Sequence, residues 1–136
     1  MNYLAKGKWI CLILFVAMAS AGCGLFVVGA GVAAGVGGAE YVHGELKQAY
    51  AAPMEKAWNA SLATIDELKM KASEKWTDNL DQYRVIKGKT KEERNFQIAL
   101  EATSKEVTTV KVRIDTFGDE EYSKRIQEVI AKNLKK

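Results

Sequence analysis

The chain of 136 residues has only two cysteines and one histidine, the residue types on which disulfide-rich domains and many metalloproteins depend. It also has a single proline. Two cysteines cannot form a multi-disulfide framework, and one histidine cannot build a histidine-rich metal site. The chain also lacks a large excess of either charge, because 20 Lys and Arg oppose 17 Asp and Glu, for a net charge of +3. This balance argues against a nucleic-acid-binding protein, which needs many unpaired cations to contact phosphates.

Charge is entirely absent from one long part of the chain, residues 9–39. The preceding residues 1–8 contain two lysines and no acid, and an apolar run over 9–19 ends in three small residues. A positive start, a short apolar core and small residues at the cleavage point are typical of a secretory signal peptide. We therefore expect residues 1–22 to be a signal peptide and the rest of the chain to be exported.

The junction Ser20-Ala21-Gly22-Cys23 resembles the lipobox of bacterial lipoproteins, in which the cysteine is acylated and becomes the mature N-terminus. By that resemblance Cys23 is the lipidation site, and several acyl chains provide the stable anchor that a single chain does not. Lipoproteins retained at the inner membrane commonly carry aspartate after the cysteine, whereas this chain has Gly24. The resemblance therefore implies a lipid anchor in the outer membrane of the cell envelope, with the remaining domain facing the periplasm. Cys11 would leave with the signal peptide.

Two other interpretations of this segment remain open. Ala19-Ser20-Ala21 is an A-x-A-like site for ordinary signal peptidase, which would release an unlipidated chain beginning at Gly22. Alternatively the signal is not cleaved, and residues 9–39 form a single membrane span, for which about 20 apolar residues suffice. Lys6 and Lys8 would then stay on the cytoplasmic side. Every interpretation exports residues 41–136.

Residues 24–39 contain six glycines and no polar side chain. Small residues let helices approach closely inside a membrane, and Gly31 and Gly35 form a GxxxG pair beside a second ridge that starts at Gly29. We expect Gly29, Gly31 and Gly35 to contact the membrane or another copy of the chain, within a membrane-contacting segment over residues 23–40. The alternative is that residues 24–39 form a flexible apolar tether. The same stretch matches G-x-G-x-x-[GA], but the second strand and acidic residue of a dinucleotide site do not follow, so no cofactor is predicted.

Residues 41–136 show the alternation of a folded domain. Alternating apolar and polar residues predict strands over 45–50, 69–75, 82–89, 94–101 and 108–116, the last two as a hairpin. Helical spacing of apolar residues predicts helices over 53–69 and from 118 to the end of the chain. The order β-α-β-β-β-β-α and the half-polar strands predict an α+β domain, an antiparallel sheet of four to five strands with two helices on one face, preceded by an N-terminal apolar signal or anchor helix.

No group of residues in the domain predicts catalysis, a cofactor site or a metal site. His43 is the only histidine, and one histidine cannot hold a metal alone. Asp119, Glu120 and Glu121 are explained by the positive end of the last helix. Trp58 lies on the apolar stripe of the first helix and is expected in the core. Trp76 stands among polar residues, and we expect it to be exposed and to contact a partner or a membrane surface.

Three further stretches carry a second resemblance: Tyr41-x-x-Gly44-Glu45-Leu46, the Pro53-opened helix, and Thr116-Phe117-Gly118-Asp119 before the closing helix. With the glycine-rich segment, they resemble a family of small Gram-negative lipoproteins known only as a domain of unknown function. That resemblance implies an envelope location and an α+β domain, and no activity.

The sequence thus predicts a non-enzymatic, membrane-anchored envelope lipoprotein that binds a protein partner, supports an envelope assembly or associates with itself, with no role in binding nucleic acid. One alternative is a single-span protein with an uncleaved anchor that oligomerises through its glycine zipper. A weaker alternative is a small-ligand-binding or enzymatic periplasmic domain.

Overall fold

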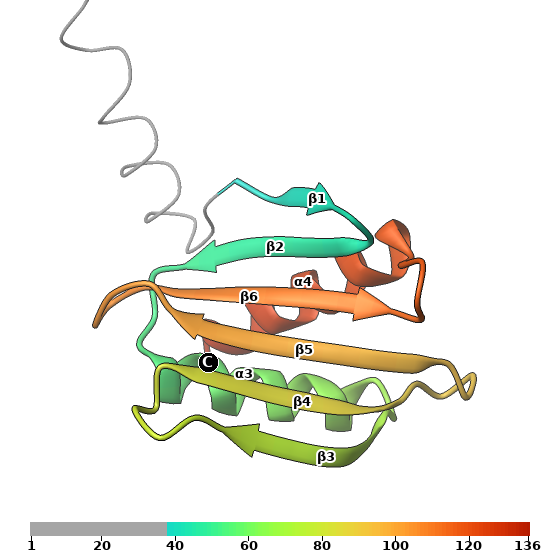
Figure 1. The fold of residues 1–136 in the computed structure, drawn as a ribbon, viewed down its shortest axis with the longest axis horizontal. Helices are drawn as coiled ribbons and strands as arrows, with labels where there is room; N and C mark the ends of the chain where they lie inside the picture. Colours follow the sequence, from blue (N-terminus) through green and yellow to red (C-terminus); the bar gives the residue numbers. More distant parts are fainter. Residues whose placement is uncertain (1–37) are drawn as a thin grey trace, which may run out of the picture.

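The computed structural model describes residues 38–136, and the expectations for the signal peptide 1–22, Cys23, Gly29, Gly31 and Gly35 lie outside the described residues. The described part forms six strands and two helices (Figure 1). The strands are β1 (Glu40–Val42), β2 (Glu45–Tyr50), β3 (Lys71–Thr77), β4 (Tyr83–Lys89), β5 (Asn95–Ala102) and β6 (Thr108–Ile114), and the helices are α3 (Met54–Glu67) and α4 (Glu120–Leu134). Within residues 38–136, neither helix has the length and apolar character needed to cross a membrane.

All six strands form one antiparallel sheet in the order β1-β2-β6-β5-β4-β3, and both helices pack on the same face (Figure 1). The predicted α+β class and the one-sided placement of the helices are confirmed. The sheet has one strand more than expected, because β1 spans only three residues and is too short to show a period. It pairs with β2 through the two-residue turn His43-Gly44, where both residues have positive φ angles, 52° and 81°.

The core lies between the sheet and the two helices. Alternate residues of β2, β4, β5 and β6 point into it. Leu46, Tyr50, Ile86, Ile98, Leu100, Val110, Val112 and Ile114 come from the sheet, and Ile126 and Ile130 come from α4; all ten are at most 2% exposed. The strand predicted over 69–75 corresponds to β3, which begins and ends two residues later. Lys69 has a φ of 56° and Met70 is buried in the core, so the chain turns there before β3 begins at Lys71.

We expected Trp58 in the core. It packs against the core but is only partly buried, at the rim, where Arg84 covers its ring. The Arg84 guanidinium carbon is 5.2 Å from the Trp58 ring centroid, and the Arg84 side chain is only 11% exposed. Its Nη2 atom lies 2.9 Å from Glu55 Oε2 and its Nε atom 2.6 Å from Asp81 Oδ1. Arg84 thus joins the first turn of α3 to the β3–β4 loop.

One buried polar residue, Gln127, fixes α4 to the sheet. The Tyr50 hydroxyl donates to Gln127 Oε1 at 2.7 Å and to the Gln127 carbonyl at 3.0 Å. Gln127 Nε2 donates to the carbonyls of Val110 at 2.9 Å and Leu46 at 3.2 Å. Every polar atom of the Gln127 side chain therefore has a partner, which buried polar groups require. Burial also raises the pKa of Tyr50, so its hydroxyl stays protonated and keeps donating.

We expect Gln127→Ala to lower the free energy of unfolding by about 1–3 kcal/mol, because it leaves the two strand carbonyls without their donor. The measurement is urea unfolding followed by circular dichroism. The control is Glu128→Ala, one residue further along α4 and exposed, which should change stability by less than about 0.5 kcal/mol. Equal losses for the two variants would contradict the assigned role of Gln127.

Candidate functional site

The sheet face opposite the helices is not covered by any element within residues 38–136. The strand register sets its side chains in rows that cross the sheet. One row contains Glu45, Arg113, Gln97, Lys87 and Glu74, from β2 to β3. The next row contains Glu40, Lys47, Lys111, Ala99, Val85 and Trp76, from β1 to β3. The second row therefore changes from charged over β1, β2 and β6 to apolar over β5, β4 and β3, whereas the first row stays polar to its end at Lys87 and Glu74.

Trp76 lies at the apolar end of the second row and is 50% exposed. Its ring meets the ring of Tyr83 edge to face, with the centroids 6.0 Å apart and the planes at 66°. Beside this pair is a shallow depression of about 370 Å³, lined also by Glu74, Val85, Lys87 and Gln97. An aromatic side chain that is already held by a neighbour loses little freedom when it binds a partner. A partner contact at Trp76 stays a prediction.

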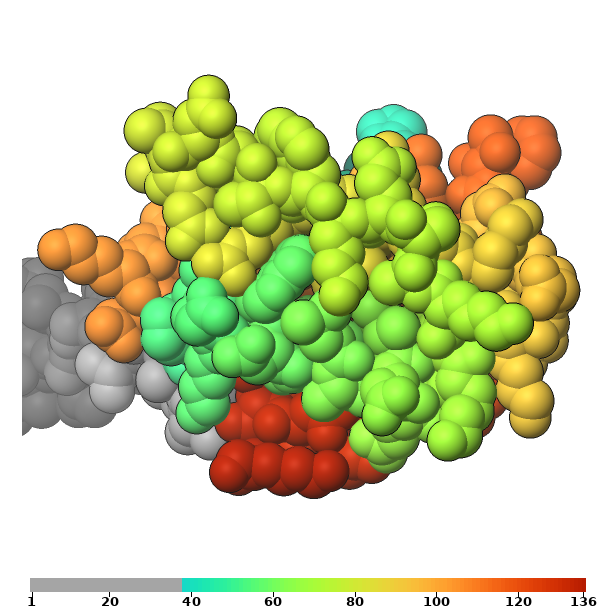
Figure 2. All heavy atoms as spheres, turned by 90° about the horizontal axis from the view of Figure 1, so that it is seen from below, coloured from blue at the N-terminus to red at the C-terminus, as the bar shows by residue number. Residues whose placement is uncertain are grey.

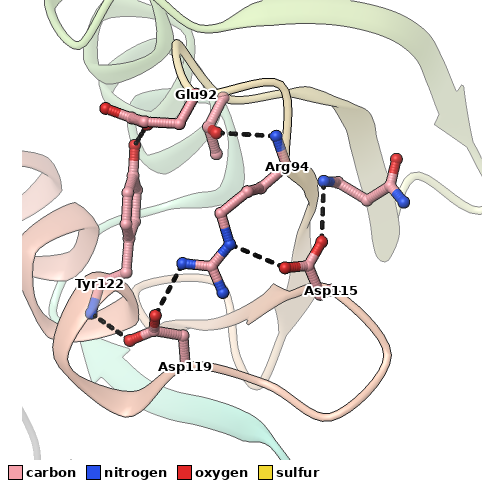
Figure 3. Close-up of polar contacts among 7 residues, drawn as sticks. Glu92, Arg94, Asp115, Asp119 and Tyr122 are labelled. Atoms are coloured by element: carbon pink, nitrogen blue, oxygen red, sulfur yellow. Dashed lines mark hydrogen bonds and ion pairs between the residues drawn. The ribbon is translucent and has the colours of Figure 1, made fainter.

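A cluster of polar contacts around Arg94 lies at one end of the sheet (Figure 3). Arg94 Nε donates to Asp115 Oδ2 at 2.7 Å, and Arg94 Nη1 donates to Asp119 Oδ2 at 2.8 Å. The second oxygen of each carboxylate accepts a backbone N–H, that of Asn95 for Asp115 and that of Tyr122 for Asp119. Asp119 is thereby the N-cap of α4. Arg94 links the start of β5 to the end of β6 and to α4.

These contacts lower the pKa of both carboxyl groups. For Asp115 the main cause is the hydrogen bond from Arg94, and for Asp119 it is the backbone N–H of Tyr122, followed by Arg94. The same two carboxylates raise the pKa of Arg94, Asp119 more than Asp115. Because each carboxylate oxygen already has a protein donor, the cluster explains the fold of this end better than it explains a ligand site.

Two glycines distant in sequence meet beside this cluster. Gly44 and Gly118 have φ angles of 81° and 82°, which L side chains rarely adopt. A Cβ atom on Gly118 would lie 2.3 Å from the Gly44 carbonyl oxygen and 2.5 Å from the Tyr41 hydroxyl. Arg113 Nη2 donates to the His43 carbonyl at 3.1 Å and strengthens the same junction. The stretches 41–46 and 116–119, which the sequence singles out separately, are therefore in contact in the fold.

Two exposed apolar residues are missed by sequence reasoning. Phe117, in the β6–α4 loop, is 92% exposed, and Leu80, in the β3–β4 loop, is 75% exposed. Each is a single apolar residue within a polar loop, so neither contributes to a periodic pattern. The one available signal is the residue type itself, a large apolar side chain where the neighbouring residues predict solvent exposure.

His43 lies in the β1–β2 turn and contributes its backbone carbonyl to the junction with Arg113. Among the residues that the structure describes, no three His, Cys, Asp or Glu side chains are close enough together to hold a metal ion. The acids at 119–121 stabilise the start of α4. Asp119 is the N-cap, and Glu120 and Glu121 lie in the first turn.

We expect Arg94→Gln to lower the free energy of unfolding at neutral pH and to reduce the further loss of stability when the pH is lowered. The two carboxyl pKa values are lower in the folded chain than the ordinary 3.8, so the folded state binds fewer protons than the unfolded state. The ion pairs therefore stabilise the fold above that pH, and this stabilisation is lost as the pH falls through the lowered values.

Urea unfolding at about pH 7 and about pH 3 measures this effect, and Arg125→Gln, an exposed arginine on α4, is the matched control. The control should lose as much stability on acidification as the unaltered protein, whereas Arg94→Gln should lose less. Asp119 keeps its bond from the Tyr122 N–H, so the change is a shallower decline and not its disappearance.

Comparison with known proteins identifies one family. No curated protein matches the sequence. A family described as "Protein of unknown function (DUF3568)" matches residues 6–133, which include the uncharged segment and all but the last three residues of the α+β domain. Since that match covers nearly the entire sequence, the chain belongs to the DUF3568 family of proteins of unknown function.

Proposed function

We propose that the protein is a non-enzymatic lipoprotein of the cell envelope, anchored by acylated Cys23, whose open sheet face binds a protein partner. The observation that carries the proposal is the asymmetry of the sheet. Both helices cover one face, and the other presents the exposed Trp76 and its neighbour Tyr83 beside rows of charged side chains. Aromatic residues surrounded by polar ones are typical of protein interfaces.

The anchor rests on the sequence at the junction Ser20-Ala21-Gly22-Cys23. The family match supports it indirectly, because the match begins at residue 6 and so includes the apolar segment together with the folded domain. With Gly24 after the cysteine, we place the anchor in the outer membrane and the domain on its periplasmic side.

The open face also indicates what kind of partner fits it. Lys111 Nζ lies 2.6 Å from Glu101 Oε2, and Arg113 Nη2 lies 3.8 Å from Glu45 Oε2, so these charges are paired within the face. Such pairs contribute little energy on an exposed surface but select partners by their charge pattern. Trp76, with Tyr83 against it, supplies the exposed apolar contact area at the β3 side. A folded protein surface with an apolar centre and mixed charges at its rim meets both requirements.

The lipid anchor is tested by metabolic labelling with palmitate and by the intact mass of protein extracted from membranes. We expect the label on the unaltered chain and on Cys11→Ser, and no label on Cys23→Ala, because only Cys23 is acylated. The mass should correspond to a chain that starts at Cys23 and carries acyl groups. Label on Cys23→Ala, or a mature protein that retains residues 1–22, would refute the anchor.

The binding face is tested by placing the photoreactive residue benzoylphenylalanine at position 76 or position 128 of the full chain in living cells. We expect a discrete cross-linked product from position 76 and none from position 128, which is exposed on the helix side. A product of twice the chain's mass identifies a second copy as the partner, and any other mass identifies a different protein. Equal cross-linking at both positions, or none at position 76, contradicts the assignment of the open face.

A further inference from the structure

The chain passes from the uncharged segment to the folded sheet without a polar linker. Residues 24–39 contain no polar side chain, and β1 begins at Glu40. An extended residue spans at most about 3.3–3.6 Å, so the three steps from residue 37 to Glu40 place the start of β1 at most about 11 Å from the preceding segment. The inference rests on the proposed function: if residues 24–37 contact the membrane, the start of β1 must lie at the membrane surface.

The strand register shows which end of the domain this is. Glu40 lies in the same row of the sheet as Trp76, at the other edge. The chain enters β1 from the end at which β3 finishes and at which β5 turns into β6 (Figure 1). The β3–β4 loop, residues 78–82, and the β5–β6 turn, residues 103–107, therefore lie at the end of the domain where β1 starts. The His43-Gly44 turn and Phe117 lie at the opposite end.

Leu80 is held outward at this same end. The loop around it is fixed by Asp78, whose Oδ1 atom accepts the backbone N–H groups of Gln82 at 2.8 Å and Tyr83 at 3.0 Å. Asp81 is paired with Arg84, so its charge is partly neutralised. In the space-filling view the yellow-green atoms of the β3–β4 loop and the orange atoms of the β5–β6 turn, at the left, lie toward the same end of the domain (Figure 2). A constrained loop thus presents a leucine that is 75% exposed.

We propose that the end of the domain formed by the β3–β4 loop and the β5–β6 turn rests on the lipid bilayer, with Leu80 inserted into its interfacial region. Three observations meet in this assignment: the missing polar linker, the end at which β1 starts, and the exposed leucine at that end. Apolar side chains partition into the headgroup–acyl boundary. Phe117 then points away from the membrane.

The test uses the full chain with Cys11→Ser and with either Leu80→Cys or Phe117→Cys, purified from membranes. Each protein is labelled with a nitrobenzoxadiazole maleimide and reconstituted into phosphatidylethanolamine–phosphatidylglycerol vesicles that contain nitroxide-labelled lipid. We expect a blue-shifted emission that the nitroxide quenches from position 80, and a water-like, unquenched emission from position 117. Both native residues are exposed, so neither substitution removes core packing.

The parent chain with Cys11→Ser alone separates the two proposals. If Cys23 is acylated, this parent takes no label, and uptake of label refutes the lipid anchor whatever the probes report. The quenching decides the orientation independently, because residues 24–39 are the same in every variant. Unquenched emission from position 80, or equal quenching at positions 80 and 117, overturns the proposed contact even where the parent stays unlabelled.

Discussion

The hydrogen bonds of Gln127 are the constraint from which the positions of the other groups follow. Because this one side chain bonds to Tyr50 and to carbonyls of two strands, α4 cannot slide or rotate on the sheet without leaving buried polar atoms unpaired. The helix therefore starts at a fixed place, with Asp119 beside Arg94. Arg94 in turn holds Asp115, and the loop between the two acids is brought against Gly44.

These contacts stabilise the covered face of the sheet and the end that carries Gly44 and Gly118. The open face, and the end formed by the β3–β4 loop and the β5–β6 turn, are the two surfaces for which we propose interactions. The end that carries Gly44 and Gly118 is closely packed, since a single added carbon at either glycine would overlap backbone atoms. The open face has no comparable close packing around Trp76, which is half exposed there. With the proposed orientation, Trp76 lies near the bilayer, so a partner on the open face binds close to the membrane surface.

The sequence predicted most of the fold because its strands and helices have regular periods, and it failed where no period exists. The alternation over β5 and β6 and the apolar stripe of α4 are long enough to be recognised, whereas β1 has three residues. Arg84 lies in the predicted strand over 82–89, but its contact with Trp58 on α3 joins two distant elements, which periodicity does not predict. The contact of Gly44 with Gly118 joins positions 74 residues apart, a pairing that local patterns cannot reveal.

The construction of the sheet edges limits how a partner can bind. β3 is exposed along all seven residues, so its unpaired backbone groups could add a foreign strand. A register irregularity between Ala72 and Glu74 interrupts that edge, and Lys71 and Lys75 place charges on it. The other edge strand, β1, is only three residues long. Short, irregular and charged edges oppose strand addition. The partner binding that we propose is therefore expected to use the side chains of the open face, around Trp76, and not the backbone of β3.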